Sequence, residues 1–298
     1  MLRREFAMQK ARSYPLYLAL PAFLLFMLFF VLPNIAGLFM SFTDWSAFYP
    51  LNPMFNGLEN FKDLFESSVF KKSIFNTVYF SVVTTAAKIV LGFLFAILLH
   101  NQLRLKTFYR TLVFAPVVIN PIVIAVIFKA LYEDVNGPIN AGLRFIGLDV
   151  LAMPWLSDPR IAMLSVSAMD IWMGVGVTMI VFLAGLQSVP EEFYEAATID
   201  GAGAWQKFMR VTLPLTSYAL MINTMLSLIN GTKVFAQVYG LTNGGPADAT
   251  QVYGTFIFKS FGAGLFGYSA AAGLLFTIVI SAISFLLLRL FKRMEVEY

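Results

Sequence analysis

Six runs of apolar residues, each long enough to cross a lipid bilayer as a helix, constrain this chain more than any other feature. A helix needs about 20 mostly apolar residues to span the hydrocarbon core. The runs cover residues 15–43, 74–100, 109–132, 160–188, 214–240 and 266–291. Charged residues make up only 13% of the chain, about half of what a soluble domain carries. The sequence therefore predicts an all-α integral membrane protein, in which residues 1–298 form a single membrane domain of six transmembrane helices. Gly92 and Ala96, four residues apart in the second run, favour close helix packing.

The lysine and arginine residues between the runs predict the orientation of the chain. With the N-terminus inside, twelve fall on the cytoplasmic side: Arg3, Arg4, Lys10, Arg12, Arg104, Lys106, Arg110, Lys207, Arg210, Arg289, Lys292 and Arg293. Six fall outside: Lys62, Lys71, Lys72, Arg144, Arg160 and Lys259. Cytoplasmic loops carry an excess of these residues, so we expect a multi-pass protein with both termini in the cytoplasm. The first run is too long for a signal peptide, and no cleavage site of small residues follows it, so we expect a retained anchor.

A polar stretch, residues 189–213, separates the fourth and fifth runs and faces the cytoplasm in this orientation. Ser188, with a glutamate three residues later, matches a capping box and predicts a short helix. Gly201 and Gly203 then permit a tight turn, and residues 205–211 can form a second short helix. We therefore expect a helix–turn–helix on the cytoplasmic face. These features alone leave open whether it docks on a partner or rests on the lipid headgroups.

The same stretch resembles a motif of the inner-membrane permease subunits of binding-protein-dependent ATP-binding cassette (ABC) importers, E-A-A-x3-G-x9-I-x-L-P. This chain carries it as Glu195-Ala196-Ala197, Gly201, Val211, Leu213 and Pro214, at the same spacings. The one departure, Val211 for Ile, keeps a β-branched apolar side chain. The resemblance implies a coupling helix between the fourth and fifth spans that inserts into a groove of a cytoplasmic ATPase. The coupling residues that it implies are Glu195, Ala196, Ala197, Asp200, Gly201, Leu213 and Pro214.

A second motif, LTNGGPADAT at residues 241–250, follows the fifth run. Its Asn-Gly-Gly-Pro sequence at residues 243–246 is a turn signal that ends a helix. The segment is similar to L-T-x-G-G-P in the carbohydrate branch of the same family, the maltose-type and glycerol-phosphate-type subunits. Ala236 is a departure, since many relatives have an acidic residue there. The resemblance implies a carbohydrate substrate, and a permease of the same machinery for another solute, such as glycerol phosphate or a polyamine, stays the alternative.

Polar and aromatic residues inside the fourth and fifth runs are the candidates for a substrate pathway. Sugars present apolar ring faces edged by hydroxyl groups, so a site for them combines aromatic rings with amides or hydroxyls. The candidates are Asp170, Asn230, Lys233, Phe235, Gln237 and Tyr239. The resemblance implies that these two spans line the pathway. At about 1.5 Å per residue, Asp170 and Lys233 fall at similar depth. A charge inside the membrane needs a partner or water, so we expect these two to pair or, as the alternative, to reach water separately.

Missing motifs limit what the chain does by itself. It has no G-x-x-x-x-G-K-[ST] phosphate loop, no cysteine and one histidine, His100, so we expect neither catalysis nor a metal or cofactor site. No block of like charge indicates nucleic-acid binding. The resemblance implies ATP and magnesium in a partner ATPase present in two copies, a second related permease subunit, and an extracytoplasmic solute-binding protein that delivers a carbohydrate. It also implies the cytoplasmic (inner) membrane of a bacterium or archaeon. Two other classes remain: an ion-coupled secondary carrier, which needs no ATPase, and a membrane enzyme, for which the runs offer no acid–base or metal constellation.

Overall fold

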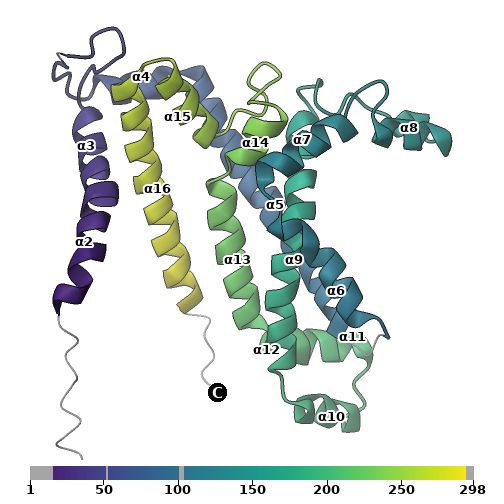
Figure 1. Ribbon diagram of the computed structural model, residues 1–298. Helices are drawn as coiled ribbons and strands as arrows, with labels where there is room; N and C mark the ends of the chain where they lie inside the picture. Colours follow the sequence, from purple (N-terminus) through teal and green to yellow (C-terminus); the bar gives the residue numbers. More distant parts are fainter. Residues whose placement is uncertain (1–15, 52, 101–103, 293–298) are drawn as a thin grey trace, which may run out of the picture. The chain divides into compact units, whose positions relative to one another are not determined.

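The computed structural model describes residues 16–51, 53–100 and 104–292, which are almost entirely helical (Figure 1). Helices are labelled α, and 3-10 or π turns are labelled η. The first half contains η1 (Leu16–Ala19), α2 (Leu20–Phe26), η2 (Met27–Val31), α3 (Leu32–Met40), α4 (Glu59–Glu66), α5 (Ser68–His100), α6 (Lys106–Phe114), η3 (Ala115–Val118), α7 (Pro121–Leu131), α8 (Pro138–Phe145) and η4 (Asp149–Leu151). The second half contains α9 (Ala162–Gln187), α10 (Glu191–Ile199), α11 (Ala204–Lys207), η5 (Phe208–Thr212), α12 (Leu213–Leu215), α13 (Ser217–Thr232), α14 (Ala236–Leu241), α15 (Tyr253–Gly262) and α16 (Phe266–Lys292). Both termini, with the predicted cytoplasmic Arg3, Arg4, Lys10, Arg12 and Arg293, lie outside the described residues.

Among the residues that the structure describes, four helical segments are long and apolar enough to cross a membrane: Tyr17–Met40, α5, α9 and Phe266–Arg289 of α16. Two bent pairs of helices raise the number to six if each pair is one span. These pairs are Lys106–Val118 with Pro121–Leu131, bent by 100°, and Ala204–Leu215 with Ser217–Thr232, bent by 64°. The nearly all-helical fold with several apolar spans is therefore confirmed, whereas the count of six spans stays a prediction.

The predicted third span, residues 109–132, is wrong as a continuous helix. It breaks at Ile119 and Asn120, whose backbones are extended, with ψ of 139° and 131°. Pro121 explains the break, because the residue before a proline is pushed out of the helical region. Asn120 then starts α7 by accepting a hydrogen bond from Ile122 N at 2.9 Å, as an N-cap residue does.

The predicted fifth span, residues 214–240, is also interrupted. The helix α13 ends at Thr232, and α14 starts only at Ala236. Glycine and β-branched residues are weak helix formers, and Gly231, Thr232 and Val234 occur together at this place. The interruption separates the 16 residues of α13 from the 6 residues of α14, so the short α14 depends on its neighbours for its position.

The described residues up to Asp63 and residues 260–274 form one compact unit. The apolar window of its helical segment Tyr17–Met40 contains no buried residue. Asn60, which is buried, connects the end of this segment to α4. Its amide donates to Ser41 O at 3.0 Å and to Thr43 O at 2.8 Å, so the loop that follows the first span is held by side-chain hydrogen bonds.

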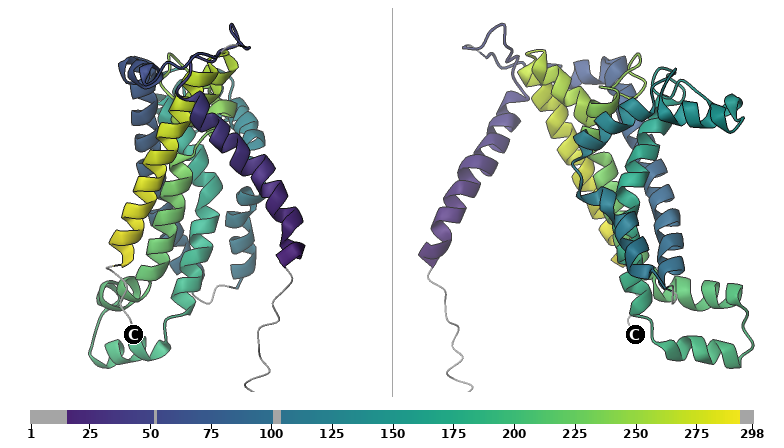
Figure 2. Two further views of the ribbon diagram at one scale, coloured as in Figure 1. Left: turned by 90° about the vertical axis from the view of Figure 1, so that its left-hand side faces the viewer. Right: turned by 45° about the vertical axis from the view of Figure 1, so that its right-hand side comes forward.

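The other described residues form a second compact unit with α5, α9 and α13 at its centre, and Figure 2 shows it from two sides. Glycines let these helices approach closely. A Cβ atom at Gly92 of α5 would lie 2.6 Å from Thr178 Cγ2 of α9, and one at Gly185 of α9 would lie 2.6 Å from Ala219 Cβ of α13. Ala96 is fully buried. The predicted close packing at Gly92 and Ala96 is therefore confirmed.

Candidate functional site

The polar stretch that follows α9 folds as two antiparallel helical segments, α10 and α11–η5, joined by a turn (Figure 2). Gly201 forms this turn with a φ of +74°, which glycine adopts at no steric cost. The predicted helix–turn–helix geometry is therefore confirmed. The predicted capping box is wrong, because α9 extends to Gln187 and takes Ser188 as its own C-cap. Ser188 Oγ donates to Gly185 O at 2.8 Å, and Pro190 occupies the N-cap of α10.

Most of the predicted coupling residues lie on accessible parts of this loop. Glu195, Ala196, Asp200, Gly201 and Pro214 are exposed, and Ala197 and Leu213 are partly buried. Two apolar residues that were not predicted share the face of Ala196: Phe193 and Ile199 expose 46% and 87% of their surface. Residues three apart occupy one helix face, so this spacing was the signal that could have identified them.

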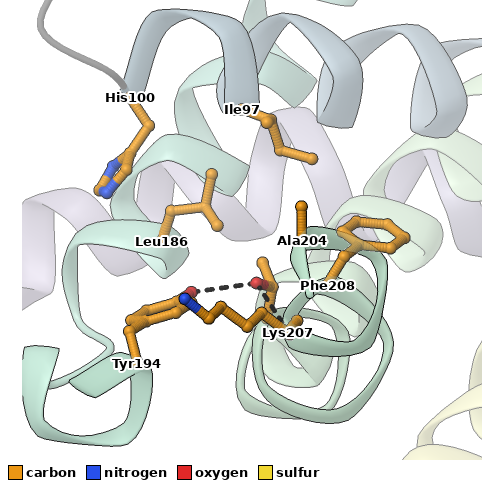
Figure 3. A pocket seen from close by; sticks show the side chains of 8 residues that line it. Ile97, His100, Leu186, Tyr194, Ala204, Lys207 and Phe208 are labelled. Atoms are coloured by element: carbon orange, nitrogen blue, oxygen red, sulfur yellow. Dashed lines mark hydrogen bonds between the residues drawn. The ribbon is translucent and has the colours of Figure 1, made fainter. Parts of the chain in front are cut away.

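Hydrogen bonds hold α10 and the segment α11–η5 together. Tyr194 Oη lies 3.1 Å from Thr212 Oγ1, and Lys207 Nζ donates to Thr198 Oγ1 at 2.8 Å. A pocket of about 380 Å³ lies beside these bonds, and His100, the last residue of α5, also lines it (Figure 3). The loop therefore has a defined conformation and a cavity between it and the ends of the spans.

A buried polar network connects α5, α9 and α14. Asp170 Oδ2 forms an ion pair with Lys88 Nζ at 2.6 Å, and Asp170 Oδ1 accepts a hydrogen bond from Gln237 Nε2 at 3.0 Å. Asp170 and Lys88 are both buried. The predicted pairing of Asp170 with Lys233 is wrong, because Lys233 lies in the break after α13 with its side chain exposed.

Lys88 was missed in the sequence, although a signal for it existed. It is the sole lysine or arginine in the second apolar run, and a charge inside a span needs a partner. Gly174 of α9 makes room for it, since a Cβ atom there would lie 2.7 Å from Lys88 Cε and 2.9 Å from Lys88 Nζ. The lysine stem therefore lies directly against the backbone of α9, one turn from Asp170.

Three aromatic rings form an accessible group near the C-terminal end of the fifth run. The ring centroids of Phe235 and Tyr239 are 5.2 Å apart and stacked, and Phe258 of α15 lies 5.2 Å from the first and 5.1 Å from the second. Tyr239 and Phe258 are 37% and 49% exposed. Phe258 was missed because α15 lies outside the apolar runs in which candidates were sought. We call Phe235, Tyr239 and Phe258 the aromatic group.

Four of the six predicted pathway residues fall into two sets, the aromatic group and the buried polar network. Phe235 and Tyr239 belong to the aromatic group, and Gln237 of the same short helix reaches Asp170. The side chains of Asn230 and Lys233 are exposed, and within the described residues no hydrogen bond or ion pair joins either to these two sets.

The predicted turn after the fifth run is confirmed. The helix α14 ends at Leu241, and Asn243 and Gly244 have positive φ values of 48° and 80°. Asn76 of α5 holds the loop by donating to Gln251 O at 2.9 Å and to Ala249 O at 3.1 Å. The buried Gln251 accepts in turn from Lys259 at 3.1 Å. The segment is thus a fixed loop attached to α5.

Three comparisons with known proteins agree with each other. A family described as "Binding-protein-dependent transport system inner membrane component" matches residues 88–295. The chain is 37% identical to "Probable ABC transporter permease protein YurN" of Bacillus subtilis, over 93% of this chain and 95% of that protein. It is 33% identical to "Multiple sugar-binding transport system permease protein MsmF" of Streptococcus mutans, over 90% and 91%. A crystal structure of a bacterial ABC transporter involved in the import of the acidic polysaccharide alginate contains a similar chain, with a TM-score of 0.81, 25% identity, and coverage of 97% and 99%.

Proposed function

The chain belongs to the family of inner-membrane components of binding-protein-dependent transport systems, and we propose that it is the permease subunit of an ABC importer for a sugar or oligosaccharide. The structural observation that supports a sugar as the substrate is the accessible aromatic group. Aromatic faces stack on the apolar faces of sugar rings, and the relatives named for their substrates carry sugars or a polysaccharide. Tyr239 lies on α14 and Phe235 is its N-cap residue, and Gln237 anchors this helix to Asp170.

The face of α10 that carries Phe193, Ala196 and Ile199 is the proposed docking site for a cytoplasmic ATPase. Exposed apolar side chains that cluster on a soluble loop mark protein interfaces, and the acidic residues beside them, Glu191 and Glu195, favour a basic rim on the partner. ATP and magnesium would bind to the two ATPase copies and not to this chain. Closure of the ATPase pair would then reach the spans through α11–η5, which leads directly into α12 and α13.

The proposed assembly contains a second related permease subunit and an extracytoplasmic solute-binding protein. With six spans and both termini in the cytoplasm, the loop of residues 242–251 faces outward, where the binding protein would deliver the sugar. Its hydrogen bonds to Asn76 make it a firm surface for such an encounter. Rocking of the two permease subunits between two states would alternate access to the pathway.

Reconstitution tests this function. The permease pair, the ATPase and the solute-binding protein are placed in liposomes, and uptake of labelled oligosaccharides is followed with and without ATP. We expect ATP-dependent uptake that requires the binding protein. Uptake that persists without the ATPase would identify an ion-coupled carrier, and ATP-driven uptake of glycerol phosphate or a polyamine in place of sugars would change the substrate class.

The aromatic group gives a residue-level prediction. Tyr239→Ala removes the accessible ring, and aromatic contacts are worth about 0.5–1.5 kcal/mol beyond their buried area. We therefore expect sugar uptake to fall by about two- to tenfold, while Tyr239→Phe keeps most of it. Tyr218→Ala on α13 is the matched control, because Tyr218 is 61% exposed and lies outside the aromatic group. Equal uptake by both alanine variants would contradict the assignment.

A further inference from the structure

The pocket between the helix ends and the polar loop combines an apolar side with a cationic side (Figure 3). Its residues come from the end of α5 (Ile97 and His100), the end of α9 (Leu186), α10 (Tyr194) and the segment α11–η5 (Ala204, Lys207, Phe208 and Thr212). The volume of about 380 Å³ is in the range of pockets that hold small ligands. The polar and apolar side chains that line it indicate a ligand with both a charged and an apolar part.

Lys207 supplies a positive charge that no carboxylate neutralises within the described residues. Its Nζ donates to Thr198 Oγ1 at 2.8 Å, but an ammonium group has three protons to donate. Tyr194 and Thr212 add a hydroxyl pair on the same side, 3.1 Å apart. Thr212 Oγ1 also donates to Lys207 O at 3.5 Å, so these two bonds use both hydroxyl protons, and the donors left for a ligand are the remaining ammonium protons of Lys207. This set of donors fits an anion with several oxygen atoms, such as a phosphate group.

The position of the pocket suggests where the anion comes from. It lies at the ends of α5 and α9, two helices that are apolar enough to span a membrane. The adjoining segment α11–η5 has the composition of an interfacial helix: Trp205 is 68% exposed and stacks on Phe208, Met209 is exposed, and Arg210 is exposed beside it. Tryptophan and basic residues concentrate at the level of the lipid headgroups.

We propose that this pocket binds the phosphate group of an anionic phospholipid, with Lys207 as its counter-charge and with Ile97, Leu186 and Phe208 against the glycerol and upper acyl carbons. The inference rests on the proposed function, which places this end of the spans at the cytoplasmic leaflet. Basic pockets between spans on that side are suited to anionic headgroups. A bound lipid would connect α10, through Tyr194, to the ends of α5 and α9 and would stabilise the loop that contacts the ATPase.

The test uses the complete transporter, purified and returned to nanodiscs of phosphatidylcholine alone or of phosphatidylcholine mixed with phosphatidylglycerol. Retained phosphatidylglycerol is counted by native mass spectrometry, and the ATPase rate is measured in the same samples. Lys207→Gln removes the charge and keeps a donor for Thr198. Lys106→Gln is the matched control, because Lys106 begins α6 on the same side, is exposed and lies outside the pocket.

A basic residue near an anionic lipid surface contributes about 1 kcal/mol, so we expect Lys207→Gln to bind phosphatidylglycerol about fivefold more weakly. The Lys106→Gln variant should bind it like the unaltered protein. If both variants bind phosphatidylglycerol equally weakly, the lipid responds to the general surface potential of the protein, and the proposal of a specific site at Lys207 is overturned. If inorganic phosphate added to nanodiscs of phosphatidylcholine alone changes the ATPase rate as phosphatidylglycerol does, free phosphate and not a lipid headgroup is the ligand, and the proposal of a bound lipid is overturned. Loss of bound lipid when the ATPase is present, and its return when the ATPase is removed, would mean that the ATPase covers the pocket, and it would overturn a lipid bound in the assembled transporter. Lipid counting needs no sugar transport, so failure of this inference is distinct from failure of the proposed function.

Discussion

The variant Lys88→Met will destabilise the folded permease strongly, because it breaks a buried ion pair from one side. The substitution keeps the length of the side chain but leaves Asp170 buried with Gln237 as its remaining partner. Breaking a buried ion pair from one side costs about 3–5 kcal/mol. The same argument applies to Asp170→Leu, which strands Lys88 against the backbone of α9 near Gly174.

The measurement is the thermal midpoint of the detergent-solubilised protein, followed by fluorescence-detected size exclusion. We expect each single variant to lower it by about 10 °C or more. The double variant Lys88→Met with Asp170→Leu should recover most of the loss, because an apolar pair can replace a buried ion pair at little cost. Lys233→Met is the control, since Lys233 is exposed. Additive losses in the double variant, or a loss as large at Lys233, would show that the pair does not act as a unit.

The second large effect is expected at the turn between α10 and α11, where Gly201→Val will uncouple ATP hydrolysis from transport. Gly201 has a φ of +74°, and a β-branched residue strongly resists this region of backbone conformation. No atom lies within 4 Å of a Cβ atom added there, so the strain comes from the backbone and not from a steric clash with the spans. The permease should therefore insert and assemble, while the position of α10 relative to α11–η5 changes.

We expect transport per ATP hydrolysed to fall at least about tenfold, with reduced co-purification of the ATPase. Gly203→Ala is the matched control, because Gly203 lies two residues away with φ −70° and ψ 170°, and it too has open space around it. Gly201→Asn should keep most of the coupling, since asparagine tolerates positive φ. If the Gly201→Val variant transports as much per ATP hydrolysed as the wild type, or if Gly203→Ala loses as much, this loop does not couple ATP hydrolysis to transport.

Local signals explain the parts of the structure that the sequence predicted well. Apolar length identified the helices, because every backbone group in a bilayer must be satisfied within its own helix. Glycine at position 201 predicted the turn, because one residue with positive φ decides it. The Asn-Gly-Gly-Pro sequence ended α14 for the same kind of reason. Pro121 was an equally local signal, and the break before α7 was predictable from it but was missed.

The sequence by itself determined the membrane class, the family motif in the polar loop and the positions of the turns, since each depends on residues adjacent in the chain. Only the tertiary structure decided that Asp170 pairs with Lys88 and not with Lys233. Depth along a span follows from residue number, but the partner depends on how each helix is rotated and which helices touch, and glycines at 92 and 174 set these contacts between segments far apart in sequence. The same holds for Phe258, which joins Phe235 and Tyr239 because the loop at residues 242–251 folds back and is held on Asn76 of α5.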